Sequence, residues 1–297
     1  MRSQLSFFIL VLVSLACRAP APPTAEAEPS AIPQKPTATF PFLPISTPVS
    51  TATKEITLPT NTPAPALLTP VHLALLPLPK GSEYEYSPYS VAWSPDGEHL
   101  ATGGLVGPVA IWNVPAQKIE HSMWVRRDTV KSVAYSHDGQ RLASGDGAGV
   151  IQIWDTNGTL LHTFEGHTNQ VTGLSWSPDD ARLISLSSDN TLHLWGTQEY
   201  NDLHFITEEF GSLGGANLMD MSLSPDGNVL ATAMFDKTVD LRDPASLEIV
   251  QTLSTFSDRV GSVLFSPNGS CLFVYVLNGQ MIMLDTATWE PVWKGSE

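Results

Sequence analysis

The chain has 297 residues and carries 15 Lys plus Arg against 30 Asp plus Glu, a formal net charge of −15 at pH 7. A chain this acidic repels phosphate backbones and anionic lipid headgroups, so we expect no nucleic acid among its partners. The only two cysteines are Cys17 and Cys271, which leaves no disulfide framework. The length suffices for one or two domains with a sizeable core.

The first 17 residues have the anatomy of an export signal. Arg2 precedes an apolar stretch over 5–16 that is short for a membrane span, and Ala16 precedes Cys17. This end resembles a bacterial lipoprotein box, although Ser14 stands where the box usually has leucine. The resemblance implies lipidation of Cys17 and attachment to a membrane only through this anchor. We expect an exported cell-surface or periplasmic lipoprotein, or alternatively a secreted protein.

Residues 18–70 are rich in Pro, Thr and Ala and show no apolar period. Such a stretch cannot bury enough apolar surface to offset the entropy lost on ordering. We expect a disordered, semi-rigid linker that tethers a globular domain over 71–297.

A tight turn recurs five times in that domain. The turns are Ser94-Pro95-Asp96-Gly97, Ser136-His137-Asp138-Gly139, Ser177-Pro178-Asp179-Asp180, Ser224-Pro225-Asp226-Gly227 and Ser266-Pro267-Asn268-Gly269. Pro at the second position and Gly at the fourth suit a type I turn. We call the third residue of each turn its anchor: Asp96, Asp138, Asp179, Asp226 and Asn268.

The sequence keeps one register around every anchor. Leucine stands four residues after each anchor, and apolar residues alternate with small or polar ones farther on, as in Ile151-Gln152-Ile153. Alternation of period two predicts strands, and four strands in about 40–45 residues predict a propeller blade. The predicted blades lie near 85–123, 124–165, 166–210, 211–254 and 255–297.

Sixteen residues after the anchors stand Trp112-Asn113, Trp154-Asp155, Trp195-Gly196, Arg242-Asp243 and Leu284-Asp285, and Gly166-His167 opens the third unit. These motifs resemble those of the WD-repeat family. The resemblance implies an all-β fold, a β-propeller of WD-repeat type with five recognisable four-stranded blades. Residues 71–76 also read as a strand, which would be the outer strand of a blade whose inner strands are missing. We therefore expect an incomplete, open ring.

Members of this family bury a hydrogen-bonded tetrad inside a blade, made of His, Ser or Thr, Asp and Trp. Only the third blade carries all four, as His167, Ser185, Asp189 and Trp195. The resemblance implies a structural role, and a Ser-His-Asp hydrolase triad is the alternative. Arg242 and Leu284 replace the tryptophan in the fourth and fifth blades, so we expect those blades to rely on apolar packing.

No motif for catalysis stands out elsewhere. The glycine-rich segment 145–149 opens no helix and joins two strands, which favours a hairpin over a phosphate loop. Cys271 lies in the second strand of the fifth blade, where a structural thiol is expected. We expect no catalytic residue, no metal and no cofactor.

Propellers of this family usually bind partners through the loops that lead into each innermost strand. Two of these loops are rich in the residue types of binding hot spots, with Tyr84, Tyr86 and Tyr89 before the first blade and Trp124, Arg126 and Arg127 before the second. The alternative is that the aromatic rings pack on neighbouring loops and Arg127 pairs with Asp128.

These observations favour a non-enzymatic scaffold for a protein or peptide partner, displayed outside the cell on a tether. A ligand-sensing or enzymatic propeller that uses the mouth of its central channel is the first alternative. A truncated remnant of a longer WD-repeat protein is the second.

Overall fold

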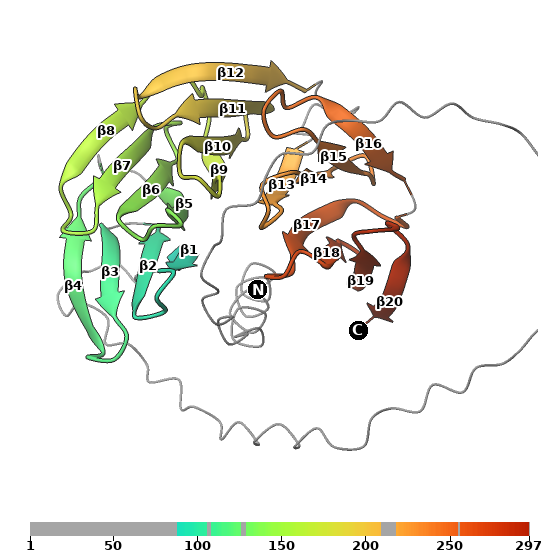
Figure 1. Cartoon of the computed structure of the whole chain (residues 1–297), viewed down its shortest axis with the longest axis horizontal. Helices are drawn as coiled ribbons and strands as arrows, with labels where there is room; N and C mark the ends of the chain where they lie inside the picture. The colour runs from blue at the N-terminus through green and yellow to red at the C-terminus, as the bar shows by residue number, and fades with distance from the viewer. Residues whose placement is uncertain (1–87, 106–107, 126–128, 209–217, 255, 297) are drawn as a thin grey trace, which may run out of the picture. The chain divides into compact units, whose positions relative to one another are not determined.

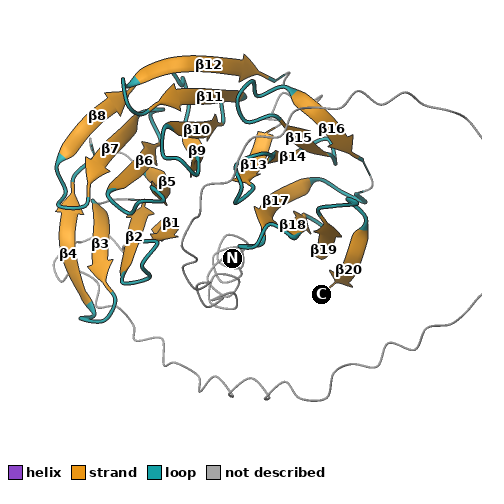
Figure 2. Ribbon diagram, in the orientation of Figure 1, coloured by secondary structure: helices purple, strands orange, loops and turns teal. Residues whose placement is uncertain are grey.

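The computed structural model describes residues 88–105, 108–125, 129–208, 218–254 and 256–296 (Figure 1). The expected signal segment 1–17, linker 18–70 and spare strand 71–76 lie outside these residues. All regular structure in the described part is β-strand, and no segment of it forms a helix that could cross a membrane (Figure 2).

Twenty strands form five antiparallel sheets, each made of four strands that are consecutive in the chain. The first blade is β1 Pro88–Trp93, β2 His99–Gly104, β3 Val109–Asn113 and β4 Lys118–Met123. The second is β5 Val130–Tyr135, β6 Arg141–Asp146, β7 Ile151–Asp155 and β8 Leu160–Phe164. The third is β9 Val171–Trp176, β10 Arg182–Ser187, β11 Thr191–Gly196 and β12 Asn201–Thr207.

The fourth blade is β13 Leu218–Leu223, β14 Leu230–Met234, β15 Val239–Arg242 and β16 Ile249–Leu253. The fifth is β17 Val260–Phe265, β18 Cys271–Val276, β19 Gln280–Asp285 and β20 Pro291–Ser296. The predicted five four-stranded blades are therefore confirmed.

The recurrent turn joins the two inner strands of each blade. In the fourth blade the Ser224 hydroxyl donates to the Asp226 carboxylate at 2.6 Å and accepts the N–H of Val229 at 2.9 Å. Gly227 closes the turn with φ +73°, a backbone conformation that favours glycine. The serine thus satisfies the backbone at the end of the turn, which explains why the motif begins with serine.

The core lies within the sheets and between neighbouring blades. The leucine four residues after the anchor is fully buried in four blades, as Leu142, Leu183, Leu230 and Leu272. Inner strands of consecutive blades contact one another, from β1 with β5 to β13 with β17, and Figure 1 shows the blades following one another along an arc. The first and fifth described blades share no such contact, so the described ring is open, as predicted.

The turns of neighbouring blades also stack on one another. A Cβ atom on Gly227 would lie 2.7 Å from Cδ of Pro178 in the preceding turn. Between the second and third blades both positions differ, because His137 replaces the proline and Asp180 replaces the glycine. His137 therefore keeps a backbone N–H, which donates to the Asp180 carboxylate at 2.7 Å, and the N–H of Asp138 donates to its other oxygen at 2.7 Å.

Replacing Asp180 with glycine tests this contact. Asp180→Gly leaves two backbone N–H groups without their charged acceptor, so the free energy of unfolding should fall by about 1.5–3 kcal/mol. The double variant H137P/D180G restores the Pro and Gly of the other turns and removes one orphaned donor. In urea titrations it should recover about 1 kcal/mol relative to D180G. Strictly additive effects of the two substitutions would contradict a direct coupling.

Candidate functional site

The predicted tetrad of the third blade is assembled as one hydrogen-bonded chain. The Trp195 indole N–H donates to Ser185 Oγ at 2.8 Å, and Ser185 Oγ lies 2.6 Å from His167 Nε2. His167 Nδ1 lies 2.8 Å from Thr191 Oγ1 and 3.3 Å from the Asp189 carboxylate. Thr191 in turn donates to Asp189 at 2.5 Å. Thr191, which joins the histidine to the aspartate, was not predicted from the sequence.

The environment of this chain suits a structural role. Ser185 is 0% exposed and its oxygen already accepts the Trp195 N–H, so no substrate can reach it. Burial lowers the pKa of His167 to about 4, and His193 adds to the shift. Burial opposes ionisation of Asp189, but bonds from Thr191 and the Thr168 N–H outweigh it and lower the pKa of that carboxyl. The geometry joins a neutral imidazole to an ionised carboxylate inside the blade.

One bond of the tetrad recurs in the neighbouring blades. It runs from the residue sixteen after the anchor, on the third strand, to the hydroxyl six after the anchor, on the second. Trp112 donates to Thr102 at 3.0 Å and Trp154 donates to Ser144 at 2.9 Å. In the fourth blade Arg242 takes the tryptophan's place, and its Nε–H donates to Thr232 at 3.1 Å.

The Arg242 guanidinium makes the fourth blade different from expectation. It is 1% exposed and also donates to the Leu247 carbonyl at 3.1 Å, to Glu208 at 2.6 Å and to Asp240 at 3.2 Å. Burial raises the pKa of Asp240, although the Thr252 hydroxyl and Arg242 favour its ionised form. The expectation that this blade relies on apolar packing is therefore wrong, because a buried ionic network replaces the tryptophan. In the fifth blade, buried Leu284 fits the expectation.

The predicted partner-binding residues are only partly within the described chain. Tyr84, Tyr86, Arg126 and Arg127 lie outside it. Tyr89 is 45% exposed in β1, and the ammonium of Lys131 lies 4.0 Å from the centre of its ring. Trp124, just after β4, is 73% exposed. Cys17, the predicted lipidation site, also lies outside the described residues.

Tyr89 and Trp124 lie at the same end of the first blade. Pro88 pairs with Gly104, and Val109 pairs with Met123, so β1 begins where β2 ends and β3 begins where β4 ends. Leu105, which follows β2, is 45% exposed at this end and was not predicted. Val125, next to Trp124, is buried and fixes the backbone there. We call Tyr89, Leu105 and Trp124 the first-blade patch.

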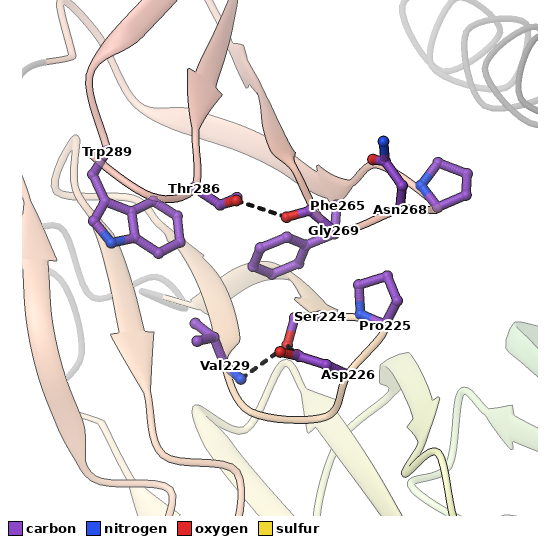
Figure 3. A pocket seen from close by; sticks show the side chains of 10 residues that line it. Ser224, Pro225, Asp226, Val229, Phe265, Asn268, Gly269, Thr286 and Trp289 are labelled. Atoms are coloured by element: carbon purple, nitrogen blue, oxygen red, sulfur yellow. Dashed lines mark hydrogen bonds between the residues drawn. The ribbon is translucent and has the colours of Figure 1, made fainter. Parts of the chain in front are cut away.

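A cavity of about 410 Å³ lies between the turns of the fourth and fifth blades (Figure 3). Phe265 and Trp289 supply its aromatic wall, and Val229 and Asp226 lie on the side of the fourth blade. The Thr286 hydroxyl donates to the Gly269 carbonyl at 2.7 Å in its wall. No group of three or more His, Cys, Asp or Glu that could hold a metal occurs among the residues described.

The lowered pKa of His167 predicts a pH-dependent stability. In the unfolded chain His167 is protonated below about pH 6.5, whereas in the folded chain it is protonated only below about pH 4. The free energy of unfolding should therefore fall by about 3 kcal/mol from this group as pH drops from 6.5 to 4. Urea titrations of the parent and His167→Gln across this window measure the difference. Parallel pH profiles would contradict the burial of a neutral His167.

Removing the charge of Arg242 should be costly, because Asp240 and Glu208 would remain without their cation. Arg242→Leu should lower the free energy of unfolding by about 3–5 kcal/mol. The matched control is Arg259→Leu, since Arg259 is half-exposed and its pair with Asp258 spans 3.7 Å. That control should cost no more than about 1 kcal/mol. Similar losses for the two variants would contradict the buried network.

Known proteins that are similar to this chain include several from fungi. The chain spans only about a fifth of the HIR1 relatives it matches. "Protein HIR1" of Eremothecium gossypii is 26% identical over 61% of this chain and 20% of its own length. "Protein HIR1" of Cryptococcus neoformans var. neoformans serotype D is 32% identical over 68% of this chain and 21% of its own. "Polyadenylation factor subunit 2" of the same fungus is 28% identical over 37% of this chain and 15% of its own.

These relatives correct the predicted localisation. They are proteins of eukaryotic fungi, one of them named as a polyadenylation factor subunit, and they point to an intracellular rather than an exported protein. The expected cell-surface or periplasmic lipoprotein, and the secreted alternative, are therefore wrong. The physical reason is that an apolar run as short as 5–16 is not specific for export, since buried segments of folded domains have the same length.

The family comparison agrees with the blade architecture. The family described as the first β-propeller of IFT122 matches residues 87–295, which include all five blades. Together with the five sheets and the recurrent turn, this match shows that the chain belongs to that family of WD-repeat β-propellers.

Proposed function

We propose that the chain is a non-enzymatic protein-interaction scaffold that contacts its partner through the first-blade patch. The observation that carries this proposal is the exposure of three large apolar side chains at one end of one blade. Trp124 is 73% exposed, and Tyr89 and Leu105 are each 45% exposed. Large apolar side chains left exposed at one end of a folded blade favour an interaction site at that end.

The chemistry of the patch supports a protein partner. Trp and Tyr dominate binding hot spots because they bury a large area with few rotatable bonds. The patch backbone is held firmly, since Val125 is buried beside Trp124 and the Thr129 hydroxyl donates to the Leu105 carbonyl at 3.0 Å. A pre-ordered surface loses less entropy when it binds.

Two further observations support the scaffold role. Ser185, in the one Ser-His-Asp set that the sequence analysis identified, is fully buried, which argues against a hydrolase. One relative is named as a subunit of a polyadenylation factor, a name that implies assembly with other proteins.

A photo-cross-linking experiment tests the patch. Benzoylphenylalanine is placed at position 124 of the full chain and, as a control, at position 250. Val250 is 74% exposed on β16 of the fourth blade, so the two sites are equally accessible. We expect discrete protein adducts in extracts of the producing cell at position 124 and not at 250. Equal labelling at both positions, or none at 124, would overturn the proposal.

Once the cross-linked partner is identified, its affinity gives a second, quantitative readout. Trp124→Ala should weaken binding at least about thirtyfold, as expected for the loss of a hot-spot tryptophan. Val250→Ala should leave the affinity unchanged.

A further inference from the structure

The turns of consecutive blades meet in a groove that recurs along the propeller. Each groove is bordered by the turn of one blade and by the turn and third-strand end of the next. The residue three after the anchor of the first of these blades lies in the groove. That residue is Arg141 between the second and third blades, Arg182 between the third and fourth, and Val229 between the fourth and fifth.

Between the second and third blades, the chain fills the groove with its own arginine. Arg141 Nη2 donates to the Asp180 carbonyl at 2.8 Å, and Nη1 lies 3.4 Å from the Thr197 carbonyl. The guanidinium carbon lies 4.7 Å from the centre of the buried Trp176 ring. Thr197 holds the acceptor in place, because its hydroxyl donates to the same Asp180 carbonyl at 2.6 Å.

The groove between the fourth and fifth blades has the same frame without the arginine. Thr286 stands in the place of Thr197, and its hydroxyl donates to the Gly269 carbonyl at 2.7 Å (Figure 3). The two grooves also share a backbone hydrogen bond. The Thr197 N–H donates to the Ala181 carbonyl at 3.0 Å, and the Thr286 N–H donates to the Ser270 carbonyl at 3.1 Å. Phe265 takes the place of Trp176.

Val229 is too short to fill this frame, which leaves the cavity of about 410 Å³. The cavity that Arg182 lines in the preceding groove measures about 200 Å³. A volume near 400 Å³ is within the range of ligand pockets. An open space therefore remains at the position that Arg141 fills between the second and third blades, whereas His99 stands at this position between the first and second.

The charge of the larger cavity suits a cation. Asp226 lies on its border, and bonds from Ser224 and from the N–H of Asn228 lower the pKa of this carboxyl and keep it ionised. Phe265 and Trp289 present aromatic rings, whose faces attract guanidinium groups. The whole chain carries a net charge of −15, which favours the approach of a basic partner.

We propose that the cavity between the fourth and fifth blades binds an arginine side chain of a protein partner, in the manner in which Arg141 occupies the groove between the second and third blades. The guanidinium donates to the Gly269 carbonyl and stacks on Phe265. This inference rests on the proposed scaffold function, but it concerns the turn end of the blades, opposite the end that carries the first-blade patch.

The test uses the full chain and a small probe, Nα-acetyl-arginine methylamide, titrated while NMR follows the Trp289 indole and Gly269 amide resonances. The uncharged citrulline counterpart and the lysine counterpart serve as controls. We expect saturable shifts with the arginine probe and at least tenfold weaker binding of both controls. No saturable shift, or equal binding of the citrulline probe, would overturn the inference.

Two reciprocal variants sharpen the test. Val229→Arg rebuilds the filled groove and should abolish probe binding, whereas Val229→Ala keeps the cavity and should bind as the parent does. Arg141→Val empties the groove between the second and third blades and should create a second binding site for the probe there, reported by the Trp176 indole. Unchanged binding by a folded V229R would overturn the inference. Cross-linking at position 124 does not depend on this cavity, so a failure here is distinguishable from a failure of the scaffold proposal.

Discussion

A buried N–H on the third strand donates to a hydroxyl on the second strand in each of the first four blades. The donor is Trp112, Trp154, Trp195 or Arg242, and the acceptor is a serine or threonine. Left alone, these buried polar groups would each cost free energy, so the bond fixes which side chains face each other across the two strands. That register places the turn at one end of the blade and the loops near Tyr89 and Trp124 at the other. The fifth blade keeps the register with apolar Leu284 instead.

The hydrogen bond within the blades repeats, whereas the contacts between neighbouring blades differ from one pair to the next. At the turn end, Asp180 accepts backbone N–H groups of the preceding blade and Arg141 fills the groove beside it, whereas Gly269 and Val229 leave the corresponding groove open. The blades therefore share one interior arrangement, while the residues that line the grooves between them differ. This division allows one ordered frame to carry the two sites that we propose, one at the first-blade patch and one between the fourth and fifth blades.

The sequence was sufficient for the parts of the fold that depend on local pattern. The five turns and the buried leucines follow from spacing, and the tetrad of the third blade follows from the resemblance to the WD-repeat family. Arg242 was interpreted as a departure from the tryptophan of the tetrad. Thr232, ten residues earlier, nevertheless stands in the place of the hydroxyl that accepts the tryptophan N–H in the other blades. The contact between His137 and Asp180 was not predicted because it joins turns 43 residues apart. Each residue on its own is only a substitution in its turn, and the two form one contact because their turns lie in neighbouring blades. The predicted export was wrong because a short apolar run carries little specificity.

Hydrogen exchange of the tryptophan indole N–H groups in the full chain tests the central bond most directly. Trp112, Trp154 and Trp195 are at most 5% exposed and donate to buried hydroxyls, whereas Trp124 is 73% exposed. We expect the first three to exchange slowly, with the protection of the folded domain, and Trp124 to exchange at the rate of free indole. Exchange of Trp112, Trp154 or Trp195 as fast as that of Trp124 would contradict this expectation.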